Sequence, residues 1–204
     1  MKLVTVLMGV AAMAATLPAT TINFAGGGSL GSSHTYGSVT ATAYLTSGTP
    51  GTTGTLFGKG TAGQTGSEDG LGITADPTGD NEIFAGADFI QLGIQCLTGA
   101  IQIALGSTGG DTWAVYGSNT LGQLGVTSLA SGGSDDGSFV TVTNATNWKY
   151  LDIKATTNNV LLQQLSYTQA TPEPISFALA GTGLLGIYFM RRRRTDSRKN
   201  DPRV

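Results

Sequence analysis

The sequence has few of the residues on which common catalytic sites depend. Its 204 residues include one cysteine and one histidine, and charged residues make up only 12%. One cysteine excludes an intramolecular disulfide. Neither Cys96 nor His34 has partner residues in a pattern typical of a catalytic nucleophile. We therefore interpret Cys96 as structural and expect that the protein is not an enzyme.

Arginine is absent between residues 20 and 170. This region holds three lysines (Lys59, Lys149 and Lys154) and ten acidic residues, whereas seven basic and two acidic residues follow Met190. Proteins that bind nucleic acid contact the phosphate backbone mainly through Lys and Arg, so an acidic, arginine-free region disfavours such binding. We expect no nucleic-acid partner.

Near the C-terminus, two prolines, an uncharged run and a basic cluster follow one another. Pro172 and Pro174 flank Glu173, and residues 175–190 carry no charge. As a helix this run would span about 24 Å, slightly less than the about 30 Å of a hydrocarbon core. Arginines remain on the cytoplasmic side, so the residues before Pro172 are predicted to lie outside the cytoplasm. The basic cluster consists of Arg191, Arg192, Arg193 and Arg194.

This order of parts closely resembles the PEP-CTERM sorting signal of exported proteins from Gram-negative bacteria. The resemblance rests on the three residues 172–174, on the glycines and leucines at positions 181–186, and on the arginine cluster. It implies that an exosortase, a processing protease, recognises residues 171–194, removes the tail and passes the protein to the cell surface or exopolysaccharide matrix. The family's signal usually ends just after the arginines, whereas a predicted cytoplasmic tail, residues 195–204, follows here. The alternative is a simple single-span tail anchor.

The N-terminus predicts a signal peptide over residues 1–19. A lysine precedes an apolar run, residues 3–15, that is too short to span a membrane, and small residues and Pro18 follow. We expect cleavage after Ala19, with cleavage after Ala14 or an uncleaved start as alternatives. The protein is then an intermediate in the inner membrane during export and ends at the cell surface or outside the cell.

Residues 20–170 predict one domain of short strands. Apolar residues alternate with others in runs such as 39–45, 90–96 and 101–105, and Gly, Ser, Thr and Asn clusters separate the runs. No stretch shows sustained helical periodicity. We predict an all-β, two-sheet antiparallel sandwich of jelly-roll-like form, flanked by a signal helix and a transmembrane helix, with the Ile90 strand central.

Several blocks within this region resemble one subfamily of exported PEP-CTERM proteins. The blocks are residues 69–73, 80–83, 89–92 and 113–118. This resemblance implies a β-sandwich outside the cell and no established activity. The glycine- and serine-rich residues 25–33 and 131–137 are predicted to be loops.

The segment between residues 68 and 88 holds six acidic residues and no basic one. A bound cation would relieve their repulsion, and calcium takes carboxylate and amide oxygens from flexible loops. The spacing does not match an EF-hand. We predict a candidate calcium site, with a solvated acidic loop as the alternative. Its candidate ligands are Glu68, Asp69, Asp76, Asp80, Asn81 and Glu82.

For function we expect a structural or adhesive protein associated with exopolysaccharide. Hydroxyl and amide side chains hydrogen-bond sugars, and Trp113, Tyr116, Trp148 and Tyr150 either stack on sugar rings or fill the core. The alternatives are a calcium-dependent carbohydrate-binding module, a passive carrier, and a glycan-active enzyme. Glycosidase chemistry requires two carboxylates about 5 to 9.5 Å apart. The sequence assigns no ligand-binding residue.

Overall fold

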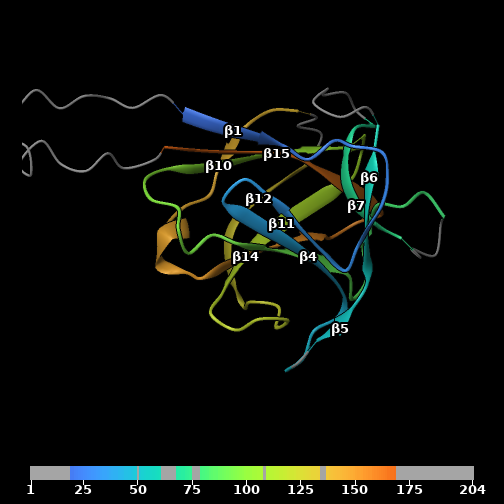
Figure 1. Ribbon diagram of the computed structural model, residues 1–204, viewed down its shortest axis with the longest axis horizontal. Helices are drawn as coiled ribbons and strands as arrows, with labels where there is room; N and C mark the ends of the chain where they lie inside the picture. Colours follow the sequence, from blue (N-terminus) through green and yellow to red (C-terminus); the bar gives the residue numbers. More distant parts are fainter. Residues whose placement is uncertain are drawn as a thin grey trace, which may run out of the picture. The chain divides into compact units, whose positions relative to one another are not determined.

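The computed structural model describes residues 19–168 except for 50, 61–67, 75–78, 108 and 134–136. All elements of this described part are β-strands apart from one short 3-10 helix, Ala145–Asn147. The strands form two antiparallel sheets packed together, which confirms the predicted all-β sandwich (Figure 1). The predicted terminal helices, the sorting motif and the tail lie outside the described residues. Within the described residues, no helix is long and apolar enough to cross a membrane.

The first sheet is built around β15, its longest strand. The order of strands is β13-β10-β15-β7-β6-β2, and β1 and β8 also pair with β15. Ala19 at the start of β1 lies opposite Thr168 at the end of β15, and Figure 1 shows the two strands side by side. The strands are β1 (Ala19–Asn23), β2 (Gly28–Gly31), β6 (Thr55–Lys59), β7 (Gly70–Thr74), β8 (Ile83–Phe84), β10 (Ile101–Gly106), β13 (Val140–Thr141) and β15 (Asn159–Thr168).

The second sheet has the order β12-β11-β14-β9-β4-β3, and β5 pairs with β4. The strand that contains Ile90, β9, lies between β14 and β4, so its predicted central position is confirmed. Neighbouring strands are often distant in the sequence, which fits the predicted jelly-roll-like form. The strands are β3 (Ser33–Tyr36), β4 (Val39–Thr46), β5 (Thr52–Thr53), β9 (Phe89–Gly93), β11 (Thr112–Ser118), β12 (Thr127–Gly133) and β14 (Tyr150–Ala155).

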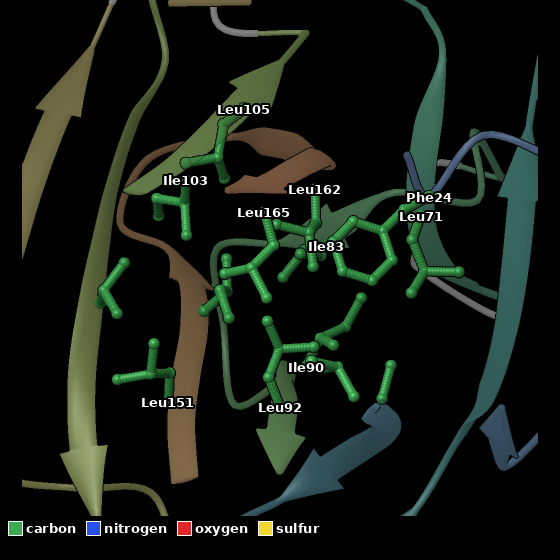
Figure 2. Packing of buried hydrophobic residues seen from close by; sticks show 14 of the residues in the cluster. Phe24, Leu71, Ile83, Ile90, Leu92, Ile103, Leu105, Leu151, Leu162 and Leu165 are labelled. Carbon is green, nitrogen blue, oxygen red and sulfur yellow. The ribbon is translucent and has the colours of Figure 1, made fainter. Parts of the chain in front are cut away.

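The core lies between the two sheets and is formed by the alternating apolar residues of their inner faces. Ile90 and Leu92 of β9 are fully buried, as are Leu162 and Leu165 of β15, and Figure 2 shows these side chains grouped between the strands. Burying one such side chain stabilises the fold by about 1.5–3 kcal/mol. Burial of these alternating apolar side chains is therefore the main contribution to the stability of the sandwich.

Two predicted loops contain strands instead. Residues 25–33 include β2, and residues 131–133 complete β12. Glycine serves here for close backbone packing: a Cβ atom on Gly58, the partner of Gly28, would lie 1.5 Å from the carbonyl oxygen of Gly26. A glycine-rich segment can therefore be a strand in which another backbone approaches closely, and not only a loop.

The predicted strand over residues 90–96 does not extend to Cys96. The strand ends at Gly93, and the amide of Leu97 donates to the carbonyl of Ile94, which closes a turn. The turn exposes Cys96, whose thiol donates to the carbonyl of Ser38 at 3.0 Å.

Candidate functional site

A groove of about 280 Å³ opens on the outer face of the second sheet. Its floor crosses three neighbouring strands, because Thr40 of β4, Gly93 of β9 and Tyr150 of β14 lie directly opposite one another. The groove is lined by Ser38, Thr40, Thr42, Gln91, Gly93, Gln95, Cys96, Leu121 and Tyr150.

Gly93 leaves the floor of the groove open. A Cβ atom at this position would lie 3.7 Å from the carbonyl oxygen of Thr40 and 4.0 Å from Cε1 of Tyr150. Both distances are ordinary van der Waals contacts, so the site has room that a glycine leaves unused. Glycine inside a strand often marks the close approach of a ligand or another backbone. In the sequence, Gly93 lies between Gln91 and Gln95 on the side of the run 90–96 that does not carry the apolar residues. The missing side chain at that position was the available signal of an open floor.

Hydroxyl groups form one side of the groove. Across β3 and β4, the hydroxyl of Ser33 lies 3.1 Å from that of Thr42, and the hydroxyl of Thr35 lies 3.0 Å from that of Thr40. Each hydroxyl has one donor hydrogen and two acceptor lone pairs, so one mutual bond does not use its whole capacity. This side therefore presents hydrogen-bonding groups that carry no charge.

The opposite wall comes from the segment between β11 and β12. Leu121 in this segment is a large apolar side chain that is 55% exposed. Beneath it, the amide of Gly122 donates to Oε1 of Gln91 at 2.9 Å, and the amide of Gly125 donates to Oδ2 of Asp152 at 2.7 Å. Two side chains from the sheet thus hold the wall in place.

Gln91 and Asp152 form a buried polar pair that the sequence did not predict. They lie opposite each other in β9 and β14, and Nε2 of Gln91 donates to Oδ1 of Asp152 at 2.8 Å. The alternation of both strands placed these residues on a solvent-facing side. The segment that carries Leu121 covers that side and buries them, which strand periodicity alone does not reveal.

Burial raises the pKa of Asp152 to about 6, although the hydrogen bonds from Gln91 and Gly125 act in the opposite direction. Removal from water disfavours the charged form, and no cation lies against this carboxylate in the described structure. Both of its oxygens accept hydrogen bonds from the protein and it is fully buried. We interpret it as a residue that positions the groove wall.

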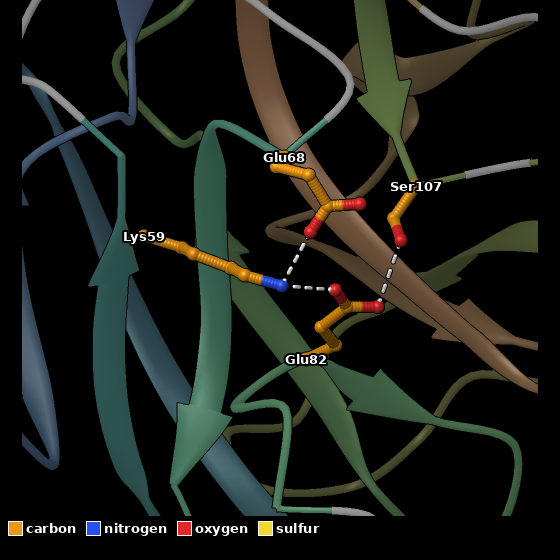
Figure 3. Close-up of polar contacts among 4 residues, drawn as sticks. All are labelled: Lys59, Glu68, Glu82 and Ser107. Atoms are coloured by element: carbon orange, nitrogen blue, oxygen red, sulfur yellow. Dashed lines mark hydrogen bonds and ion pairs between the residues drawn. The ribbon is translucent and has the colours of Figure 1, made fainter.

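The predicted calcium ligands are brought together only in part, around a lysine. Nζ of Lys59 on β6 lies 2.5 Å from Oε2 of Glu68 and 2.6 Å from Oε1 of Glu82, and Ser107 donates to the other oxygen of Glu82 at 2.9 Å (Figure 3). Glu82 is only 4% exposed. The expectation that this acidic segment lacks a counter-charge is therefore wrong for at least three of its six carboxylates. Lys59 reaches Glu68 and Glu82, and Lys154 interacts electrostatically with Asp88.

The other candidate ligands are placed differently. Asp69 is half-buried, Asp80 is exposed, and Asn81 is half-buried with a left-handed backbone angle (φ 60°). Asp76 lies outside the described residues. The part of the chain that the structure describes holds no group of three or more His, Cys, Asp or Glu side chains arranged for a metal ion. Calcium binding stays a prediction.

Among the four aromatic residues considered for sugar stacking, one lines the groove. Trp113 is 2% exposed and belongs to the core, and Trp148 packs on Gly117, where a Cβ atom would come 2.4 Å from its ring. Tyr116 and Tyr150 are half-buried, and only Tyr150 belongs to the groove lining.

Residues 170–194 match a known family, the PEP-CTERM protein-sorting motif. This chain carries a PEP-CTERM sorting signal. The signal implies export across the membrane to the cell envelope or surface, with processing by an exosortase. No curated protein and no solved structure matches the chain. The candidate sorting residues of this PEP-CTERM protein, Pro172 to Pro174 and the four arginines, fall within the match.

Proposed function

We propose that this PEP-CTERM protein is a non-catalytic module of the cell surface or extracellular matrix. In this proposal the sandwich associates with exopolysaccharide and has a structural or adhesive role. The observation that carries the proposal is the sorting motif at residues 170–194, which follows a sandwich with an open, uncharged groove. A protein that is exported and then released from its anchor needs another contact to remain at the surface. In this proposal an extracellular polysaccharide supplies that contact.

The geometry of Glu68, Glu82 and Asp152 supports a non-catalytic role. Glu68 and Glu82 approach each other, but the ammonium of Lys59 lies between them and bonds to both. A glycosidase holds its two carboxyl groups on either side of the glycosidic bond, which would have to occupy that space. The other buried carboxylate, Asp152, is bonded through both oxygens to the protein.

Intact-mass measurement of the protein from culture medium and from membranes tests the export part of the proposal. We expect a membrane form that retains residues 175–194 and a shorter released form that lacks them. Replacement of Pro172, Glu173 and Pro174 by alanine should leave only the membrane form, and Glu68→Ala serves as a control outside the motif. Released protein that still contains residues 191–194 would contradict exosortase processing.

Co-sedimentation with the extracellular polysaccharide of the same cells tests the association. We expect the released protein to sediment with the polysaccharide and to remain soluble after the polysaccharide is removed. The assay in calcium and in a chelator also tests the alternative of a calcium-dependent carbohydrate-binding module. Absence of co-sedimentation under both conditions would reject the association.

A further inference from the structure

We propose that the groove formed by β4, β9 and β14 binds one sugar unit of a neutral glycan, with Tyr150 as the surface on which the sugar ring rests. This inference rests on the proposed association with polysaccharide. It adds the place of binding, the chemical class of the ligand and the residues that select it.

The charge of the groove favours a neutral ligand. None of the nine lining residues is charged. The region between residues 20 and 170 has ten acidic residues and three lysines, so its overall field repels polyanions. Lys59 is engaged by Glu68 and Glu82, and Lys154 donates to the carbonyl of Gly86. The lining therefore offers no cation that could pair with the negative charge of a uronate or a sulfated sugar.

The chemistry of the lining matches the two kinds of surface on a sugar ring. The faces of a pyranose carry apolar C–H groups, and aromatic rings offer large, rigid contact surfaces for them. Tyr150 and Leu121 supply apolar surface, whereas Thr40, Thr42 and the exposed Gln95 supply groups for the ring hydroxyls. Ligand sites usually combine apolar walls with a few convergent polar groups in this way.

The size of the groove limits how much of a glycan it holds. Its volume of about 280 Å³ lies just below the lower end of the about 300–1,000 Å³ typical of small-molecule pockets. We therefore expect one ring to enter, with the rest of the glycan chain extending over the hydroxyl rows of β3 and β4. Binding by a single ring is weak, and many copies on one polysaccharide would strengthen it through multivalency.

Gly93→Leu is the sharpest test, because it fills the groove without disturbing the backbone. The new Cβ atom meets its neighbours at 3.7 and 4.0 Å, and Gly93 does not have a positive φ, so the variant should fold. Gly109→Leu is the matched control, because Gly109 also lacks a positive φ and a Cβ atom there would have no heavy atom within 4 Å. We expect about tenfold or greater loss of affinity for Gly93→Leu and none for Gly109→Leu.

Tyr150 provides a second, independent variant. Tyr150→Ala should weaken binding by about tenfold, whereas Tyr150→Phe, which keeps the ring, should remain within about twofold of the wild type. A purely structural role of Tyr150 would lower the unfolding midpoint of the alanine variant without this separation in affinity. Thermal unfolding of each variant is therefore measured beside its binding.

The experiment uses the exported protein recovered from the cells and their own extracellular polysaccharide, separated by anion exchange into neutral and acidic fractions. Affinity electrophoresis in gels that contain either fraction measures the binding. Retardation by the neutral fraction that Gly93→Leu and Tyr150→Ala weaken by about tenfold or more supports the inference. Preference for the acidic fraction, or neutral binding that both variants retain, overturns it while the proposed association stands. Binding to neither fraction rejects the association itself.

Discussion

Glu82 and Asp152 are both buried carboxylates, and the two sheets accommodate them in different ways. Glu82, beside the first sheet, contacts the ammonium of Lys59 and the hydroxyl of Ser107. Asp152, in the second sheet, contacts only the neutral amide of Gln91 and the backbone amide of Gly125 among the hydrogen bonds of the described structure. Glu82 is therefore balanced by a counter-ion, whereas Asp152 is stabilised only by hydrogen bonds from neutral groups.

This difference separates the conditions on which each region depends. Burial alone would lower the pKa of Lys59, but its hydrogen bonds and attraction to Glu68 and Glu82 raise it, so the lysine stays charged. Asp152 has no such partner, and burial raises its pKa to about 6. The stability of the cluster formed by Lys59, Glu68 and Glu82 therefore depends on the lysine. The protonation state of Asp152, which supports the groove wall, depends on the pH.

Removal of the counter-ion should have the largest effect. Lys59→Met keeps the apolar stem but leaves Glu82 buried with its charge unbalanced, and loss of one partner of a buried ion pair costs about 3–5 kcal/mol. Because Glu68 is 63% exposed, most of this cost should come from Glu82. Denaturant unfolding at pH 7 measures the change.

The control for this prediction is Lys149→Met. Lys149 is exposed and precedes β14, so its replacement should change the free energy of unfolding by less than about 0.5 kcal/mol. The double variant with Lys59→Met and Glu82→Gln should recover part of the loss. Equal, small effects of the two lysine variants would show that the ion pair does not support the fold.

Asp152→Asn, which neutralises the carboxylate in the second sheet, should change the pH dependence of the unfolding free energy. The change should be smaller than the loss expected for Lys59→Met. The pKa of Asp152 is higher in the folded than in the unfolded protein, so its contribution is fully present below the unfolded value and is lost as the pH rises through about 6. For Asp152→Asn this contribution is absent. The difference in unfolding free energy, wild type minus variant, should therefore fall by about 2 kcal/mol between pH 4.5 and 7.

Chemical unfolding at several pH values measures this difference. The subtraction removes the contributions of the remaining carboxylates, which both proteins share. Gly109→Ala, which changes no titratable group and places its methyl group where no heavy atom lies within 4 Å, serves as the control and should show the pH dependence of the wild type. Parallel curves for wild type and Asp152→Asn would show that the buried carboxylate does not titrate in this range.

The effect of calcium on stability tests whether the acidic segment around Lys59, Glu68 and Glu82 is a metal site. If the acidic segment binds calcium, a concentration ten times the dissociation constant should stabilise the fold by about 1.4 kcal/mol. Lys59→Met should increase this effect, because the ammonium no longer competes for Glu68 and Glu82. Thermal unfolding with millimolar calcium, with magnesium as the control, measures it. An unchanged midpoint in both proteins would end the calcium hypothesis.

The smallest effect concerns a buried polar group without either kind of partner. The hydroxyl of Tyr36 is buried and has no hydrogen-bond partner, and burial raises the pKa of Tyr36 to about 12. Tyr36→Phe keeps the ring that packs against Phe24 and removes the unsatisfied group. We expect no loss, or a gain of up to about 1 kcal/mol. A loss above that size would mean that the hydroxyl is bonded in solution.

The strands were predictable where one face is apolar and the other polar. The runs that contain Val39, Ile90 and Ile101 predict strands because every second residue is apolar, and all three are strands. The glycine-rich strand β2, with the sequence Gly-Ser-Leu-Gly, has too few large side chains to show this alternation. The pairing of β2 with β6 depends on close contacts between backbones. From its composition alone, such a glycine-rich segment is predicted to be a loop.

The sequence by itself determined the class of fold and the sorting signal. Both are local patterns: alternation along each strand, and two prolines, an apolar run and arginines in a fixed order. Only the tertiary structure decided which side chains meet. Lys59 reaches Glu82 through the pairing of strands and the path of the chain around them, and Thr40, Gly93 and Tyr150 line one groove because three strands share one register. Contacts between distant residues depend on strand register and order, which no local pattern specifies.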